Sequence, residues 1–141
     1  MINALDLTSS MNYVSKYDSG EVKTVWSLGI LDTRIRKMLE DLSWEYEIDP
    51  SKPGTGTAKS SFNLGKSELE FVAFGLKGFK KFSMSDTGKP VHFKTEERCV
   101  GQKVYQVLAS SVIDIIPSEV VKELAEQIKN FNKVNEVEAK N

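Results

Sequence analysis

The sequence predicts an α+β fold in a single domain, and three observations lead to this prediction. Residues 21–31 alternate apolar and polar side chains, which is the period of a strand with one buried face. Residues 118–131 place apolar side chains at steps of three and four, which is the period of an amphipathic helix. A turn over residues 85–88 separates two short alternating segments and indicates a β-hairpin. We therefore expect about three main helices with short antiparallel strands and hairpins.

Composition limits the class of protein. The chain has 141 residues, of which 40% are hydrophobic and 28% charged, as in an ordinary globular domain. Cys99 is the only cysteine, which excludes an intramolecular disulfide and favours synthesis in a reducing compartment. No stretch approaches the roughly 18 apolar residues of a membrane span, so we expect no membrane partner. We expect one domain over residues 1–133 and a C-terminal tail over residues 134–141.

The first half of the chain predicts a hairpin followed by a helix. Residues 12–17 are the expected partner of the strand at residues 21–31, with Asp18-Ser19-Gly20 as a turn signal between them. Asp32 stands where a helix N-cap is expected, because its carboxylate can accept hydrogen bonds from the first exposed amides. Apolar residues then recur at helical spacing, and we expect a helix from about Thr33 to Glu45.

Residues 49–61 are rich in proline, glycine and hydroxyl side chains, which predicts a mobile loop. Gly54, Gly56 and Lys59 resemble part of a phosphate-binding loop, but Ala58 stands where that loop needs a glycine before the lysine. We therefore expect no nucleotide site and no cofactor. A loop that becomes ordered against another subunit is the preferred interpretation. Its candidate contact residues are Lys52, Thr55, Thr57 and Lys59.

A second helix is predicted to begin at a capping box, in which Ser67 and Glu70 satisfy each other's exposed amides. Its apolar side chains cover most of the circumference, which is typical of a central, buried helix. Gly75 and Gly78 weaken a helix, so we expect close packing or the helix end at these positions. The expected apolar positions are Leu69, Phe71, Val72, Ala73, Phe74, Leu76 and Phe79.

The middle of the chain is basic. Residues 59–103 carry a net charge of +4, between segments of −3 and −2, and such opposite blocks suit contacts between copies or with a docking protein. Lysines interleaved with Phe79, Phe82 and Phe93 are also typical of a single-strand nucleic-acid surface. The phenylalanines lie where a core needs them and the total charge is only −1, so nucleic-acid binding by residues 77–103 is the alternative. Its candidate contacts are Lys80, Lys81, Lys89, Lys94 and Arg98.

Signals of catalysis are weak, and we predict that the chain is not an enzyme. His92 is the only histidine, which rules out a two-histidine metal site within one chain, and we expect no metal. No G-x-S-x-G nucleophile motif occurs. Cys99 and His92 are seven residues apart in an expected hairpin region. This spacing alone does not identify a nucleophile and its base.

The C-terminal part predicts a short strand at residues 103–108, a helical turn near residues 111–115 and a long final helix. Pro117 and Ser118 are expected to begin that helix, with the serine as its cap. The apolar stripe stops after Lys133. We expect residues 134–141 to be a solvated tail or an arm that binds a neighbour, with Val134 and Val137 as candidate protein contacts.

Three segments carry a resemblance to a known group of proteins. They are KTVWSLGILD at residues 23–32, VAFGLKGFKKF at residues 72–82 followed by D-x-G-K-P-V-x-F, and IPSEVVKELAEQI at residues 116–128 with a terminal EAKN. Together they resemble small proteins encoded in the structural-gene clusters of tailed bacteriophages. The pattern spans most of residues 20–141, consists of common residues and contains no catalytic signature.

The resemblance implies a non-enzymatic virion or particle-assembly protein that works in many copies around the portal, neck, tail or capsid. It implies that the partners are other phage structural proteins and copies of the chain itself. It also implies localisation in the virion after synthesis in the host cytoplasm. No functional residues are carried over from the resemblance.

Overall fold

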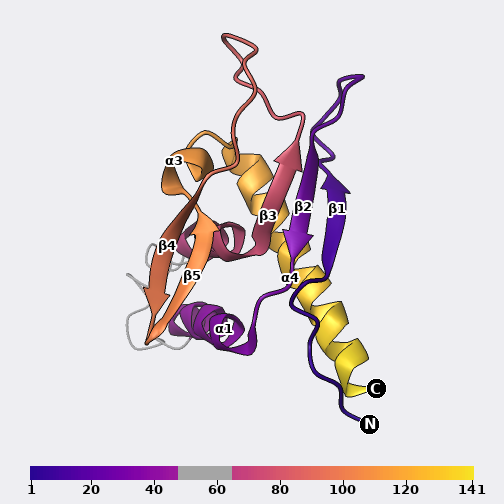
Figure 1. Ribbon diagram of the computed structural model, residues 1–141, viewed down its shortest axis with the longest axis vertical. Coiled ribbons are helices and arrows are strands. Elements are labelled where there is room, and N and C mark those ends of the chain that lie inside the picture. Colours follow the sequence, from indigo (N-terminus) through magenta and orange to yellow (C-terminus); the bar gives the residue numbers. More distant parts are fainter. Residues whose placement is uncertain (48–64) are drawn as a thin grey trace.

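Two small antiparallel sheets and four helices make up residues 1–47 and 65–141, the part of the chain that the computed structural model describes. One of the helices, over residues 65–75, carries no label in Figure 1. The other elements, in chain order, are β1 (Ser10–Val14), β2 (Val25–Gly29), α1 (Thr33–Glu47), β3 (Leu76–Lys80), β4 (Thr95–Val100), β5 (Lys103–Leu108), α3 (Ser110–Ile113) and α4 (Ser118–Lys140).

The elements surround one hydrophobic core. The first sheet has the order β1-β2-β3, and β4 pairs with β5 in a second, two-stranded sheet. α4 crosses one face of the first sheet, whereas α1 lies near the β4–β5 hairpin (Figure 1). Side chains from all of these parts, including Leu28, Leu39, Leu108 and Leu124, belong to one buried cluster. The predicted α+β class is therefore confirmed.

The first predicted hairpin is present as β1 and β2, although β1 covers Ser10–Val14 rather than the expected residues 12–17. Five residue pairs connect the strands, from Ser10 with Gly29 to Val14 with Val25. Trp26 and Leu28 are buried as the alternation predicts, because α4 covers this face of the sheet. Val22 was expected on the same face but is exposed, since β2 begins only at residue 25.

α1 follows β2 almost directly. Asp32 is its cap, as predicted, because its Oδ1 atom accepts a hydrogen bond from the Ile35 amide at 2.9 Å. Ile35 and Leu39 lie in the core at the spacing that the sequence indicated. The helix continues to Glu47, two residues beyond the predicted end at Glu45.

The second predicted helix differs from expectation at both ends. It begins before Ser67, whose buried hydroxyl has no hydrogen-bond partner in the described part of the chain. Glu70 binds Arg98, so the capping box is wrong. Leu69 was expected to be buried but is exposed. The helix ends at residue 75, and the residues predicted to continue it form β3, because pairing with β2 satisfies their backbone groups.

Gly75 lies at this helix end and also at a close approach to α4. A Cβ atom there would lie 2.6 Å from Cγ2 and 2.9 Å from Cδ1 of Ile128, which is fully buried. Both predicted reasons for a glycine at this position, close packing and the helix end, are therefore confirmed.

The segment between β3 and β4 turns back on itself without forming two regular strands. A single bridge joins Ser83 to Pro90, and the Met84 amide donates to the Lys89 carbonyl at 2.8 Å. The hairpin expected here is thus reduced to a turn. β5 covers the predicted residues 103–108, whereas β4 was not predicted because its alternation involves mainly polar side chains.

The C-terminal prediction needs two corrections. The N-cap of α4 is Pro117, without a side-chain hydrogen bond, so Ser118 is the first helical residue rather than the cap. Residues 134–140 were expected to form a separate tail but continue α4 to Lys140. The Asn3 amide donates to the Ala139 carbonyl at 2.9 Å, so the beginning of the chain is held beside this part of the helix.

Candidate functional site

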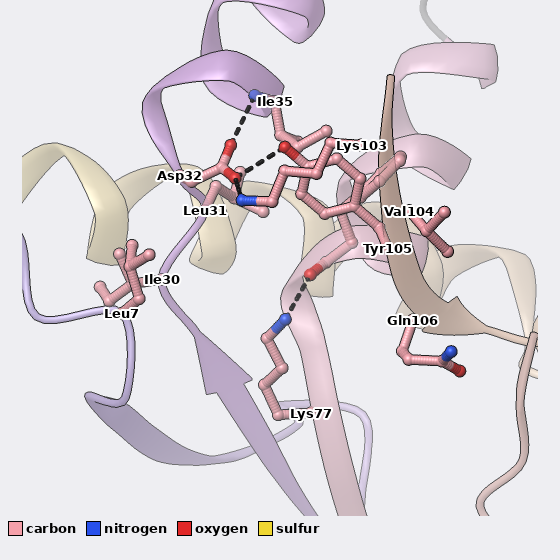
Figure 2. Close-up of a pocket in the computed structure, with 11 residues that line it drawn as sticks. Leu7, Ile30, Leu31, Asp32, Ile35, Lys77, Lys103, Val104, Tyr105 and Gln106 are labelled. Atoms are coloured by element: carbon pink, nitrogen blue, oxygen red, sulfur yellow. Dashed lines mark hydrogen bonds and ion pairs between the residues drawn. The ribbon is translucent and has the colours of Figure 1, made fainter. Parts of the chain in front are cut away.

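A pocket that contains several charged and polar side chains lies where α1 begins. Its volume is about 280 Å³, and it opens between the N-terminal end of α1, the start of β3 and the strand β5 (Figure 2). Apolar side chains form part of its wall. The charged and polar residues that line it include Asp32, Lys77, Lys103 and Tyr105.

Asp32 is the centre of this group. While its Oδ1 atom caps α1, its Oδ2 atom accepts hydrogen bonds from the Tyr105 hydroxyl at 2.7 Å and the Lys103 ammonium at 3.0 Å (Figure 2). The carboxylate therefore joins the start of α1 to β5. The sequence predicted the cap but not the partners on β5, which are more than 70 residues away and leave no local signal.

The electrostatics of the group favour a fixed arrangement. Burial acts to raise the pKa of Asp32, but hydrogen bonds from Ile35, Tyr105 and Lys103 outweigh it and hold the pKa below the ordinary value. Burial raises the pKa of Tyr105, and its hydrogen bond to Asp32 raises it further. At neutral pH the carboxylate is ionised and the phenol keeps its proton. This arrangement suits a structural contact between α1 and β5.

Lys77 is the remaining cation of the pocket. Its ammonium group donates to the Phe74 carbonyl at 2.9 Å. Burial of the ammonium group lowers the pKa of Lys77, although the residue as a whole is exposed. Asp32 counteracts this effect through its charge. Within residues 1–47 and 65–141, Lys77 forms no ion pair.

Replacing Asp32 with alanine is expected to lower the free energy of unfolding by about 1–2 kcal/mol at pH 7, because the cap and the bonds to β5 are lost. Since the folded pKa is below the unfolded value, the ionised group stabilises the protein above the unfolded pKa. That contribution is lost as the pH falls through the folded pKa. Urea titrations between pH 2.5 and 7 should therefore show the difference from wild type shrinking below about pH 4.

Asp86→Ala is the matched control for this experiment, because Asp86 is an exposed turn residue. Within residues 1–47 and 65–141, its carboxylate bonds only the neighbouring Thr87 amide. We expect this variant to change stability by less than about 0.5 kcal/mol. A pH dependence of stability that is the same in the Asp32 and Asp86 variants would contradict the role assigned to Asp32.

A second group of polar contacts lies deep in the fold, around Asn132. Its side chain is only 4% exposed. Oδ1 accepts from the Leu31 amide at 2.6 Å, and Nδ2 donates to the carbonyls of Gly29 at 3.1 Å and Ile128 at 2.8 Å. Arg36 donates to the Asn132 carbonyl at 2.9 Å. No local pattern indicated a role for this residue, because its partners Leu31 and Gly29 lie about 100 positions away.

The predicted protein contacts fall into two sets. Val134 and Val137 lie on α4 with exposed fractions of 54% and 48%. Their spacing of three residues places them on neighbouring positions of one helix face. The other set is Lys52, Thr55, Thr57 and Lys59, which lie outside the described residues, as does the whole predicted mobile loop at residues 49–61.

The predicted nucleic-acid contacts are not equivalent. Lys80, Lys81, Lys89 and Lys94 are exposed. Arg98 instead binds the Glu70 carboxylate through two hydrogen bonds of 2.7 Å, and its guanidinium lies 5.4 Å from the centre of the Phe74 ring. Arg98 thus serves the contact between β4 and the helix of residues 65–75.

The phenylalanines of the basic segment are engaged with each other. Phe79 makes edge contacts with Trp26, Phe82 and Phe93, at ring-centre distances of 5.2–5.7 Å. All three phenylalanines pack against the core. This confirms the expectation that these rings pack in the core. Fewer ring faces are therefore free for bases to stack on.

The other residues considered for chemistry lie apart from these groups. Cys99 is an exposed free thiol on β4, and His92 is in the segment before β4. In the described part of the chain, no group of three or more histidine, cysteine, aspartate or glutamate side chains is placed to hold a metal ion.

Comparisons with known proteins identify no relative. No protein-family model, no curated protein and no solved structure matches the chain. Among residues 1–47 and 65–141, no helix combines the length and apolar character needed to cross a membrane. The resemblance to phage proteins therefore stays a prediction.

Proposed function

We propose that this chain is a non-enzymatic bacteriophage protein that acts in particle assembly through protein–protein contacts. It works in several copies, in the portal, neck, tail or capsid region, and its partners are other phage structural proteins and copies of itself. The protein is made in the host cytoplasm and becomes part of the virion or of an assembly intermediate. The resemblance of residues 20–141 to small structural-cluster proteins supports the phage context of this proposal.

The observation that carries the proposal is an exposed apolar surface near both ends of the chain. We call it the terminal surface and define it as Val134 and Val137 on α4, which are 54% and 48% exposed. The bond from Asn3 to Ala139 holds the N-terminal segment beside α4, and Figure 1 shows both ends at the same extremity of the fold. Apolar side chains gathered on a projecting helix are typical of a protein contact.

The protein-contact proposal accounts for more observations than the nucleic-acid alternative. Arg98 is occupied by Glu70, and the phenylalanines are packed against the core. Lys80, Lys81, Lys89 and Lys94 remain exposed, which is the support for the alternative. It predicts binding to a labelled oligonucleotide that weakens with salt and with neutralisation of Lys80, Lys81 and Lys94.

The double substitution Val134→Asp and Val137→Asp tests the terminal surface. We expect wild-type protein to show concentration-dependent association in sedimentation velocity, and we expect the double variant to associate at least about tenfold more weakly. The reason is that a contact cannot bury two unpaired carboxylates without a large desolvation cost. Both side chains are exposed in the free chain, so the fold should be retained.

Val22→Asp is the matched control, because Val22 is a valine that is 70% exposed on the loop between β1 and β2. It should associate like wild type. Wild-type protein that stays monomeric and binds no phage structural protein would contradict the proposal, and so would equal association of the control and the double variant.

A further inference from the structure

One buried carboxylate is left without a full set of partners. Glu123 on α4 is 8% exposed, and its Oε2 atom accepts a hydrogen bond from the Lys16 amide at 3.1 Å. Its Oε1 atom is buried and has no hydrogen-bond partner among the described residues. A buried carboxylate oxygen without a donor is costly, so this group is suited to bind a donor from outside the chain.

Glu123 lines a pocket of about 340 Å³ between the end of β1 and the first half of α4. Tyr13 and Tyr17 contribute aromatic wall, and Glu119 and Glu126 contribute further negative charge. Burial raises the pKa of Tyr13, and the nearby Glu123 carboxylate, through hydrogen bonding and its charge, and then the charge of Glu126 raise it further. Carboxylates and tyrosine rings together favour an ammonium or guanidinium group as the ligand.

Lysines also line the pocket, but among the described residues they form no ion pairs with its glutamates. Lys16 and Lys122 line it, yet neither forms an ion pair in the part of the chain that the structure describes. The Lys16 ammonium instead lies 5.2 Å from the centre of the Tyr17 ring. The position next to Glu123 thus remains suited to a cation from another molecule.

The pocket lies beside a sheet edge that is open to pairing. β1 pairs only with β2, and its other edge has no hydrogen-bonded strand among the described residues. β1 has the sequence SMNYV, without a charged residue or proline, and its pairing with β2 has no bulge. The opposite edge strand, β3, carries Lys77 and Lys80 and has a register shift, which are features that discourage added strands.

We propose that this flank binds an extended segment of a partner protein, which pairs with β1 and places a lysine or arginine side chain in the pocket against Glu123. Side chains that lie opposite each other on neighbouring strands point to the same face. Because Tyr13 lines the pocket, the residue opposite Tyr13 in an added strand points toward it. The basic side chain occupies this position.

A second copy of the chain fits the flank less well. Antiparallel pairing of two β1 strands about a two-fold axis places residues of equal parity opposite each other, so only Met11 or Tyr13 of the second β1 faces Tyr13. Neither side chain supplies a cation for Glu123. We therefore infer that the partner is a different protein. This inference does not rest on the proposed function, because it does not involve the terminal surface.

The test uses isotope-labelled protein and three blocked model peptides. The first is Thr-Val-Lys-Val-Thr, the second has norleucine in place of lysine, and the third has N-methyl groups on the backbone that prevent strand pairing. We expect the lysine peptide to shift the amide resonances of residues 10–17 and 119–127. It should bind about tenfold or more tightly than the norleucine peptide, and the N-methylated peptide should not bind.

Glu123→Gln should weaken binding of the lysine peptide about tenfold and leave binding of the norleucine peptide unchanged, because it removes the charge and keeps the shape. Glu138→Gln is the matched control on the exposed end of α4 and should behave like wild type. The Val134→Asp and Val137→Asp variant should bind the lysine peptide normally, which separates this site from the terminal surface.

Several results would overturn the inference. Equal binding of the lysine and norleucine peptides would do so, as would resonance shifts confined to other parts of the protein. The absence of any shift at peptide concentrations up to about 5 mM would also contradict it. Shifts at residues 10–14 that depend on protein concentration alone would show that a second copy occupies the edge instead.

Discussion

Replacing Asn132 with leucine is expected to lower the free energy of unfolding by about 3 kcal/mol. Leucine has a similar size but cannot hydrogen bond, so the Leu31 amide and the Gly29 carbonyl lose their side-chain partner in a buried place. Each such group costs roughly 1–3 kcal/mol when it is left unpaired. These bonds join α4 to the connection between β2 and α1, so their loss weakens the contact between these parts of the fold.

Urea denaturation of wild type and variant gives the difference directly. Asn135→Leu is the matched control, because Asn135 is on the same helix. Among the residues that the structure describes, its side chain bonds only the Phe131 carbonyl, at 2.8 Å within the helix. We expect the control to lose less than about 1 kcal/mol. Equal losses in the two variants would show that the contacts of Asn132 with Leu31 and Gly29 contribute little.

Replacing Gly75 with alanine is the second large effect, with an expected loss of about 2 kcal/mol. The new Cβ atom would lie 2.6 Å from Cγ2 of Ile128, a distance at which the core must shift. The backbone itself is not the cause, because Gly75 is not among the glycines with positive φ. Gly65→Ala is the control, since a Cβ atom there meets no atom of the described residues within 4 Å, apart from its chain neighbours and its own helix backbone. We expect this variant to be neutral or slightly stabilising.

A double-mutant cycle with Ile128→Ala separates the steric contact from other effects. Ile128→Ala alone should cost about 2–5 kcal/mol, because it leaves a cavity in the core. When residue 75 is already alanine, the new methyl group fills part of that cavity and the clash disappears. The cost of Ile128→Ala should then fall by at least about 1 kcal/mol. Additive effects would contradict direct contact between positions 75 and 128.

Local sequence patterns predicted those elements whose causes are local. The alternation at Trp26 and Leu28 identified β2, and the cap at Asp32 located the beginning of α1, because these signals depend on near neighbours. The helix that ends at residue 75 was predicted to continue, because Leu76 and Phe79 fit a helical stripe as well as a strand. Pairing with β2 decides between the two, and that pairing is not visible locally.

The candidate sites depend still more on contacts between distant residues. The partners of Asp32 on β5 and the pocket beside Glu123 exist only once α4, β1 and β5 are placed in space. The end of α4 was missed because the apolar stripe stops near Phe131, although residues 134–140 remain helical. Helical hydrogen bonds continue without a stripe when the side chains do not oppose them. This helical continuation is what presents Val134 and Val137 on one face.

Quantitative mass spectrometry of purified phage particles and assembly intermediates shows whether this chain takes part in particle assembly. We expect its peptides to co-purify with portal, neck, tail or capsid proteins, in several copies for each particle or intermediate. The Val134→Asp and Val137→Asp variant should be depleted from these fractions, whereas Val22→Asp should be retained at the wild-type level. A chain that is found only as free monomer, at background level in every particle and intermediate fraction, would contradict a role in assembly.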